Sequence, residues 1–397
     1  MMAIRAITEG LRHGGVSGWI RKSAAALALV ALCGGAGIGP AAAQTPMIEV
    51  TDLAGRTVKV KAGAQRIILG EGRLMYGLGI LDTEKPFQRI AGWSEDMILY
   101  DPGSYRAFKA KFPEAEKLPR FGSAFSGDFS VEKALSLAPD VVLMPLSGIY
   151  KARETGLIDK FEKAGVPVVF IDLREEPLVN TVPSILLAGQ IYGREKQAQE
   201  FVNFYLRESR KVMVRVAQKK DKDRVPVFFE RAAGYQADQC CMTFGNANLG
   251  AVLQAAGGLN WGTAKFAGLG GEVNQEVIFA DNLPVIIGTG ADWAESTPGS
   301  RAVPFGYETN PVAVQEALKG LANRKGWPTL KAVQTKRFYG VYHQFYTSPS
   351  HVVALQVFAK WLYPEEFKDL DPQATWAEYH QRFSPIPLTG QFWAQLQ

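Results

Sequence analysis

The sequence is poor in cysteine and histidine and carries little excess charge. Its 397 residues include 3 Cys and 4 His, and the net charge is only +5. No run rich in Lys and Arg stands out, so nothing supports binding to nucleic acid. Zinc sites need several His, Cys or carboxylate ligands. Since no His-rich loop is present, the sequence argues against direct capture of a bare metal ion.

Motifs of the common enzyme classes are also missing. The sequence has neither the G-x-S-x-G nucleophile elbow nor the G-x-x-x-x-G-K-[ST] phosphate loop. Gly70-Glu71-Gly72 begins like a dinucleotide fingerprint, but Met75 stands where the third glycine belongs. Without a recognisable catalytic constellation, we expect a protein that is not an enzyme. An exported enzyme is the less favoured alternative.

The N-terminus has the three parts of a secretory signal. Arg21 and Lys22 precede an apolar stretch from Ala24 to Leu32, and Ala41 to Ala43 form a small-residue cleavage site. The apolar stretch is shorter than the roughly 20 residues that a membrane span needs. We predict cleavage after Ala43 and a periplasmic product. A lipoprotein anchored at Cys33 is the alternative, although a bulky Leu before that Cys fits it poorly.

Short apolar runs alternate with helix-like segments along the rest of the chain. Buried strands that alternate with helices predict an α/β fold with mainly parallel sheets. A continuous helical pattern covers residues 194–219, with apolar residues at helical spacing. We therefore expect two α/β lobes joined by one long backbone helix, with a ligand cleft between the lobes. The expected parts are a signal peptide (1–43), an N-terminal lobe (44–193), a linking helix (194–220) and a C-terminal lobe (221–397).

A matching segment occurs once in each predicted lobe. Gly127 lies five residues before Glu132, which lies nine before a strand that begins at residue 141. Gly271 and Glu276 have the same spacing to a strand at residue 285. The repeat indicates two related lobes that face each other. In open α/β sheets, ligands bind beyond the carboxyl ends of the strands.

Several motifs resemble those of the iron-siderophore and cobalamin periplasmic binding proteins, the helical-backbone class III family. They are TDLAGRTV at 51–58, SVE at 130–132, LAPDVV at 137–142 and AGVPVV at 164–169. The C-terminal segment from His343 is similar to a siderophore-type subgroup. The resemblance covers essentially the whole chain after the signal. It implies an inner-membrane ABC permease as partner and only modest closure of the lobes.

In such proteins one exposed acidic residue per lobe docks on the permease, and Glu132 and Glu276 stand at the matching positions. A charge at each lobe fixes register on a partner and aids encounter. The simpler interpretation is that both are acids near helix N-termini, where the helix dipole favours them. The two interpretations are compatible.

Aromatic residues and arginines recur where the loops of the cleft are expected. Aromatic rings supply apolar contact area at low entropy cost, and Arg offers a planar fork to carboxylate or catecholate oxygens. This set suits a bulky, polar or anionic metal complex. The candidate ligand-binding residues are Arg73, Trp93, Tyr105, Tyr150, Arg231, Tyr235, Trp293, Arg301, Tyr342, His343 and Tyr346.

We therefore expect a monomeric solute-binding protein that needs no cofactor and captures a ferric siderophore, an Fe(III) chelate. Hydroxamate, catecholate and carboxylate chelates all remain open. Haem, which His343 or Tyr346 can ligate, and corrinoids are the alternatives. Cys240 and Cys241 are adjacent, and we expect either two partly buried thiols or a small local disulfide ring, which would restrict the unfolded chain very little.

Overall fold

The computed structural model describes residues 46–236 and 240–397, so the predicted signal peptide lies outside the described residues. Its first element is the hairpin predicted from sequence, in which β1 (Met47–Thr51) pairs antiparallel with β2 (Thr57–Lys61). The turn between them contains Gly55, at a φ of 74° that suits glycine. Within the described ranges, no helix is both long and apolar enough to cross a membrane.

The N-terminal lobe is built on a five-stranded, fully parallel sheet with the order β5-β4-β3-β6-β7. Helices cover both faces of this sheet. Successive side chains along β6 point to opposite faces and therefore pack against different helices. Val142 and Met144 pack with α5, α6 and α7, whereas Val141 and Leu143 pack with α2, α4 and α8. The elements are β3 (Ile67–Leu69), α2 (Met75–Leu78), β4 (Ile90–Ser94), α3 (Asp96–Tyr100), α4 (Pro102–Lys111), β5 (Arg120–Phe121), α5 (Val131–Ser136), β6 (Val141–Pro145), α6 (Ile149–Glu154), α7 (Leu157–Lys163), β7 (Val168–Ile171) and α8 (Pro177–Tyr192).

The C-terminal lobe has a mixed sheet with the order β11-β9-β8-β12-β13-β14, and β10 also pairs with β8. Its centre is parallel, since β8, β10, β12 and β13 run the same way. Three strands pair antiparallel with their neighbours: β11 and β14 at the two edges of this path, and β9 next to β11. The elements are β8 (Val225–Glu230), β9 (Met242–Phe244), α10 (Leu249–Ala255), β10 (Gly258–Asn260), β11 (Gly270–Glu272), α11 (Gln275–Asp281), β12 (Val285–Gly290), α12 (Pro311–Ala322), α13 (Lys331–Gln334), β13 (Phe338–Tyr342) and β14 (Trp393–Gln395).

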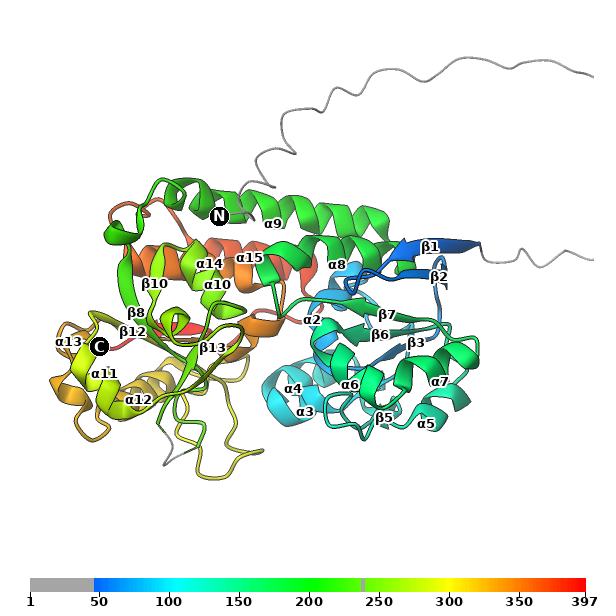
Figure 1. The fold of residues 1–397 in the computed structure, drawn as a ribbon, viewed down its shortest axis with the longest axis horizontal. Coiled ribbons are helices and arrows are strands. Elements are labelled where there is room, and N and C mark those ends of the chain that lie inside the picture. The colour runs from blue at the N-terminus through cyan, green and yellow to red at the C-terminus, as the bar shows by residue number, and fades with distance from the viewer. Residues whose placement is uncertain (1–45, 237–239) are drawn as a thin grey trace, which may run out of the picture. The chain divides into compact units, whose positions relative to one another are not determined.

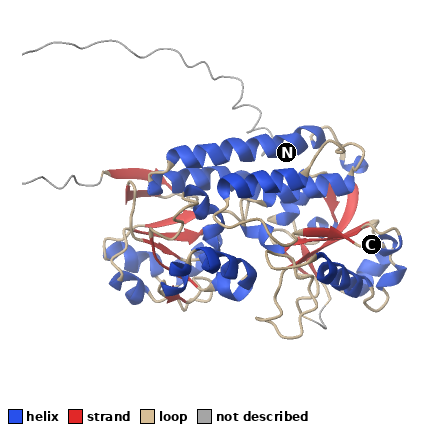
Figure 2. Cartoon of the chain, turned by 180° about the vertical axis from the view of Figure 1, so that it is seen from behind, coloured by secondary structure: helices blue, strands red, loops and turns tan. Residues whose placement is uncertain are grey.

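A long helix, α9 (Glu195–Val216), connects the two sheets, and α8 and α14 (His351–Leu362) pack along it (Figure 1). Its buried stripe includes Phe201, Tyr205 and Val212. The aromatic side chains of α15 (Pro372–Phe383) also meet this stripe, with Phe383 5.3 Å from Phe201 between ring centroids. Figure 2 shows the same helices from behind, above the two groups of strands. The predicted fold class, two α/β lobes joined by one backbone helix, is confirmed.

Candidate ligand-binding cleft

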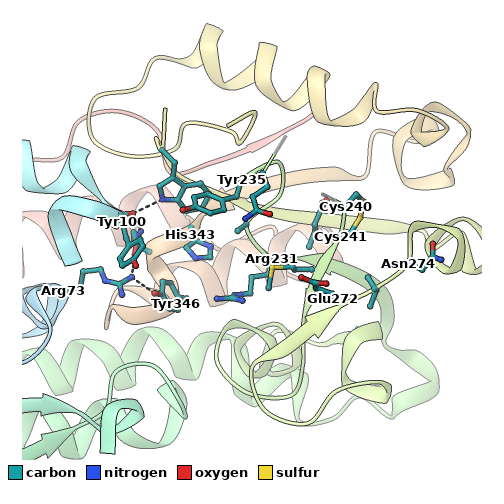
Figure 3. A pocket seen from close by; sticks show the side chains of 17 residues that line it. Arg73, Tyr100, Arg231, Tyr235, Cys240, Cys241, Glu272, Asn274, His343 and Tyr346 are labelled. Carbon is teal, nitrogen blue, oxygen red and sulfur yellow. Dashed lines mark hydrogen bonds between the residues drawn. A yellow bond between two sulfur atoms is a disulfide. The ribbon is translucent and has the colours of Figure 1, made fainter. Parts of the chain in front are cut away.

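A cavity of about 720 Å³ lies where the two lobes meet. Arg73 and Tyr100 line it from the N-terminal lobe, and the other lining residues come from the C-terminal lobe (Figure 3). Several of them follow the carboxyl ends of parallel strands, as expected for an α/β sheet. The lining residues are Arg73, Tyr100, Glu230, Arg231, Ala232, Tyr235, Gln236, Cys240, Cys241, Met242, Glu272, Val273, Asn274, Trp293, His343, Gln344 and Tyr346.

Arg73 is a buried arginine with a full set of partners. It follows β3, and its guanidinium pairs with Glu71 at 2.8 Å and with Asp96 at 2.7 Å. It also donates a hydrogen bond to the hydroxyl of Tyr346, across the cleft. Burial acts to lower the pKa of Arg73, but Tyr346, Glu71 and Asp96 outweigh burial and raise that pKa well above its usual value. The guanidinium of Arg73 is therefore always charged, and most of its hydrogen-bonding capacity is used by residues of the protein itself.

Arg231 faces the same cavity from the C-terminal lobe without such partners. It comes directly after β8, and Figure 3 shows its side chain extending toward Tyr346. Among the described residues it forms no ion pair, and its buried Nε atom has no hydrogen-bond partner. Burial lowers the pKa of Arg231 from its usual value; Tyr346 acts to raise that pKa, and the charge of Arg174 acts to lower it. A partly buried guanidinium without a partner is a ready site for an anion.

An aromatic wall connects these two arginines. The rings of Tyr235 and Trp293 meet edge to face at 4.9 Å between centroids, and Trp293 meets His343 at 5.1 Å. His343 lies 4.7 Å from Tyr346 by the same measure. The indole Nε1 of Trp293 donates to the backbone oxygen of Tyr100 at 2.9 Å, which ties this wall to the N-terminal lobe.

His343 is held as a neutral ring inside this wall. Its Nδ1 lies 2.8 Å from the hydroxyl of Thr289, on strand β12. Burial lowers the pKa of His343 well below its usual value, and the charges of Arg231, Arg73 and Arg174 lower it further. At neutral pH the described lining residues of the cleft therefore carry positive charge on arginine alone.

The other end of the cavity is rich in sulfur. Cys240 and Cys241 are joined by a disulfide, and Met242 follows them at the start of β9. We call these three residues the sulfur end. Glu230, at the end of β8, lies beside the two cysteines, and Arg324 binds both of its carboxylate oxygens at 2.6 and 2.7 Å. One end of the cavity is thus lined by arginines and aromatic rings, and the sulfur end is lined by polarisable sulfur atoms.

The structure brings together six of the eleven candidate ligand residues. Arg73, Arg231, Tyr235, Trp293, His343 and Tyr346 all line the cavity. Their role in ligand binding remains a prediction, but their side chains share one space although Arg73 and Tyr346 are far apart in the sequence.

The other five candidates lie elsewhere. Trp93 is buried in the N-terminal core against Phe87, and the hydroxyl of Tyr105 accepts a hydrogen bond from Arg120. Tyr342 is buried, with its hydroxyl 2.9 Å from that of Ser104. Tyr150 is 81% exposed, outside the cavity lining. Arg301 lines a neighbouring cavity, which shares Trp293 and Cys240 with this one.

Several lining residues were not among the candidates. Tyr100 stands over Arg73, 5.2 Å from its guanidinium carbon to the ring centroid. Gln344 donates to the backbone oxygen of Tyr100 at 2.7 Å. Glu230 is the last residue of β8, so its position just before the candidate Arg231 was a usable signal. The lining residues on β9 and β11 gave no such signal, because these strands have only three residues each, too few to show a strand pattern in the sequence.

Glu132 and Glu276 lie at equivalent places in the two lobes. Glu132 is in the first turn of α5 and Glu276 in the first turn of α11, and both are exposed. The helices are capped alike, since the side chains of Ser130 and Asn274 each accept a backbone N–H bond. Each helix leads into a central strand, β6 or β12. The repeat found in the sequence is therefore a structural repeat as well.

Residues 104–344 match the family model described as periplasmic binding protein. The chain belongs to this family. The resemblance drawn from the motifs is thereby confirmed, and this periplasmic binding protein is the solute receptor of an ABC importer. Proteins of the family bind small ligands outside the cytoplasm and work with ABC permeases.

Solved structures agree with this assignment. The chain is 28% identical to the TroA-like periplasmic binding protein FepB from Veillonella parvula, with a TM-score of 0.81 over 89% of this chain and 100% of that one. The molybdate-binding protein MolA from Haemophilus influenzae matches with 18% identity and a TM-score of 0.65, covering 87% and 100%. CeuE from Helicobacter pylori, in a nickel–histidine complex, matches with 16% identity and a TM-score of 0.62, covering 86% and 96%. The sequence matches none of the curated proteins with which it was compared.

Proposed function

We propose that this protein captures a ferric siderophore, or a similar anionic ferric chelate, in the cleft and delivers it to its ABC permease. The observation that carries the proposal is Arg231, whose guanidinium reaches the cavity without a carboxylate partner among the described residues. Burying such a charge is costly unless an anion meets it. A chelate with carboxylate or catecholate oxygens supplies that anion.

The aromatic wall and the size of the cavity support the same ligand class. Ligand pockets generally measure about 300–1,000 Å³, and this cavity of about 720 Å³ falls in that range. Tyr235 and Trp293 offer flat apolar faces to the organic part of a chelate. We propose that the chelate arrives with its iron already bound, so the protein holds no metal or cofactor of its own for this task.

The test is a ligand titration of the protein that lacks residues 1–43, with tryptophan fluorescence as the readout. The panel contains ferric hydroxamate, catecholate and carboxylate chelates, haem, cobalamin and free metal ions. Saturable quenching by one ferric chelate, with a Kd around micromolar or tighter (about −8 kcal/mol or better), supports the proposal. Binding restricted to haem, cobalamin or bare ions replaces the ligand, and no binding at all removes the proposal.

A variant of Trp293 locates the signal. Trp293 lines the cavity, so Trp293→Phe should remove most of the quenching. Binding of the chelate by the Trp293→Phe variant is then measured independently, from the coloured chelate that the protein retains in ultrafiltration. Unchanged quenching in this variant places the ligand outside the cleft.

Haem is the second candidate, because one residue favours it. Tyr346 lines the cavity, its hydroxyl accepts a hydrogen bond from Arg73, and a tyrosine oxygen can ligate the iron of haem. The haem titration separates the candidates, since ligation changes the visible absorption of haem and Tyr346→Phe should abolish that change.

We also propose that residues 1–43 are a secretory signal and that the protein acts as a monomer without catalysis. We further propose that Glu132 and Glu276 dock on the permease. The exposed, equivalent places of the two acids support the docking role. Glu132→Gln with Glu276→Gln should lower uptake in cells while leaving the Kd for the chelate unchanged. Glu114→Gln, which changes an exposed acid elsewhere on the N-terminal lobe, is the matched control.

A further inference from the structure

Cys240 and Cys241 are the only cysteines in the part of the chain that the structure describes, and both line the cleft. They are joined by a disulfide. A disulfide stabilises a fold mainly by restricting a loop of the unfolded chain. Since these cysteines are neighbours in sequence, the loop between them is minimal. Stability therefore does not explain the pair, and its place on the cavity wall requires another reason.

The backbone around the pair is fixed independently of the disulfide. The N–H of Cys241 donates to the oxygen of Val273 at 3.3 Å, and the N–H of Val273 donates to the oxygen of Cys241 at 2.9 Å. The N–H of Arg231 donates to the oxygen of Met242 at 2.8 Å. These ladder bonds hold the segment between β8 and β11. The two sulfur atoms thus stay at the cavity when the bond between them is reduced.

A carboxylate lies within reach of both sulfurs. The ligand atoms of Glu230, Cys240 and Cys241 all lie within 4.8 Å of one another. Glu230 is 1% exposed, and Arg324 binds both of its oxygens. A carboxylate oxygen has more than one lone pair, so Glu230 can accept from Arg324 and still coordinate a cation. Two thiolates and one carboxylate form a donor set that suits zinc and cadmium.

We propose that the reduced Cys240–Cys241 pair, with Glu230, is a second binding site in this cleft, for a thiophilic divalent cation of the zinc and cadmium type. The site is separate from the arginines that the proposed chelate would use. A dithiol reductant opens the site: it gives two electrons and two protons to the disulfide, and becomes a disulfide itself. The cation then displaces one proton from each thiol to solvent.

Local charge favours this occupancy. Two thiolates neutralise a divalent cation, while Arg324 already neutralises Glu230. No uncompensated charge is then left in the buried wall. The thioether of Met242, which also lines the cavity, adds a soft neighbour. The oxidised pair lacks thiolates, so the site exists only in the reduced protein.

The test uses cadmium alone, with no chelate, so that its result is independent of the proposed cargo. The protein is reduced with a dithiol, freed of reductant under nitrogen and titrated with Cd²⁺. We expect one Cd²⁺ per chain, with thiolate-to-cadmium absorption in the ultraviolet. The protein that was never reduced should bind at least about 100-fold more weakly, because two charged ligands are missing.

Variants and a chemical control assign the ligands. Cys240→Ser with Cys241→Ser should abolish the ultraviolet absorption, and Glu230→Gln should weaken Cd²⁺ binding about tenfold. Glu114→Gln, which changes an exposed acid on the N-terminal lobe, should leave it unchanged. Alkylation of the reduced wild-type protein gives the same answer without a mutation, should the serine variant fail to fold. Equal Cd²⁺ binding by oxidised, alkylated and reduced protein overturns the proposal, and so does a folded, reduced protein that binds none.

Discussion

Arg73 and Arg231 bring guanidinium groups to the same cleft from different lobes, but their surroundings differ. Arg73 is surrounded by Glu71, Asp96 and Tyr346. Among the described residues, Arg231 has only the positive charge of Arg174 and the phenol of Tyr346 as charged or titratable neighbours. The difference teaches that a charge in a cavity is not by itself a ligand site. The charge that the fold has already neutralised holds the lobes in place, and the charge that it has left unpaired is available to an anion.

Removing Arg73 should have the largest effect, and it acts on stability. Arg73→Met keeps much of the apolar stem but leaves the buried Asp96 without its cation. Breaking a buried pair in this way costs about 3–5 kcal/mol. Urea unfolding of the ligand-free protein measures the loss. Arg231→Ala is the control, and it should cost less than about 1 kcal/mol; equal losses for the two variants would erase the comparison.

Acid should destabilise the protein through histidines that the fold keeps neutral. Burial lowers the pKa of His351 to about 4 in the folded state, against about 6.5 in an unfolded chain. The unfolded chain therefore takes up a proton in this interval that the folded chain refuses. Stability is complete above pH 6.5 and falls as the pH drops toward 4, by about 3 kcal/mol from His351 alone.

Unfolding free energies at several pH values measure this loss. In His351→Gln the dependence on pH should become shallower by about one proton, whereas an unchanged slope would contradict the assignment to His351. Both arginines stay charged over this range, so acid leaves the contrast between them intact.

Removing Arg231 should act on affinity. Hydrogen bonds to charged groups contribute about 1.5–3 kcal/mol, so Arg231→Ala should weaken an anionic ferric chelate about 10- to 150-fold. A neutral chelate should lose far less. Arg301→Ala removes an arginine outside the cleft and should change neither affinity. Equal losses for the anionic and neutral chelates would remove Arg231 from its proposed role.

The smallest effect is a change in the pKa of His343. Burial is the first cause of its lowered pKa and the charge of Arg231 is the second. Arg231→Ala should therefore raise the pKa of His343 toward its usual value. Nuclear magnetic resonance of the ring protons measures this shift, with His351 as an internal reference that should stay at about 4. A pKa of His343 that does not respond would show that Arg231 lies farther from it than the structure has it.

The sequence predicted the layered fold because buried strands leave a plain signal. The runs that became β6 and β12 are short, apolar and bounded by Pro, Gly or Asp. The helical spacing of residues 194–219 predicted α9, which runs from Glu195 to Val216. Arg73 and Arg231 were selected because each follows such a strand. Parallel strands end at one edge of their sheet, which makes the residues after them good candidates.

The rest of the cleft depends on side-chain direction, which the sequence does not reveal for loops and edges. Trp93 and Tyr105 were candidates, yet both point into the N-terminal core. Tyr150 was expected after β6 but stands on α6, facing solvent. The sulfur end depends on short antiparallel strands at the sheet edge. Three residues are too few to show an alternating pattern, so only the three-dimensional pairing brings Glu230 to the cysteines.

The length of α9 has a mechanical consequence. A helix of 22 residues is about 33 Å long, and this one is buttressed by α8 and α14. A helix packed in this way is a stiff spacer between the lobes, because bending it means breaking its hydrogen bonds and repacking the two neighbouring helices. We therefore expect the spacing between α5 and α11 to stay nearly constant when the cleft fills. A permease that grips both helices would have to sense cargo through small tilts, not through a large change in span.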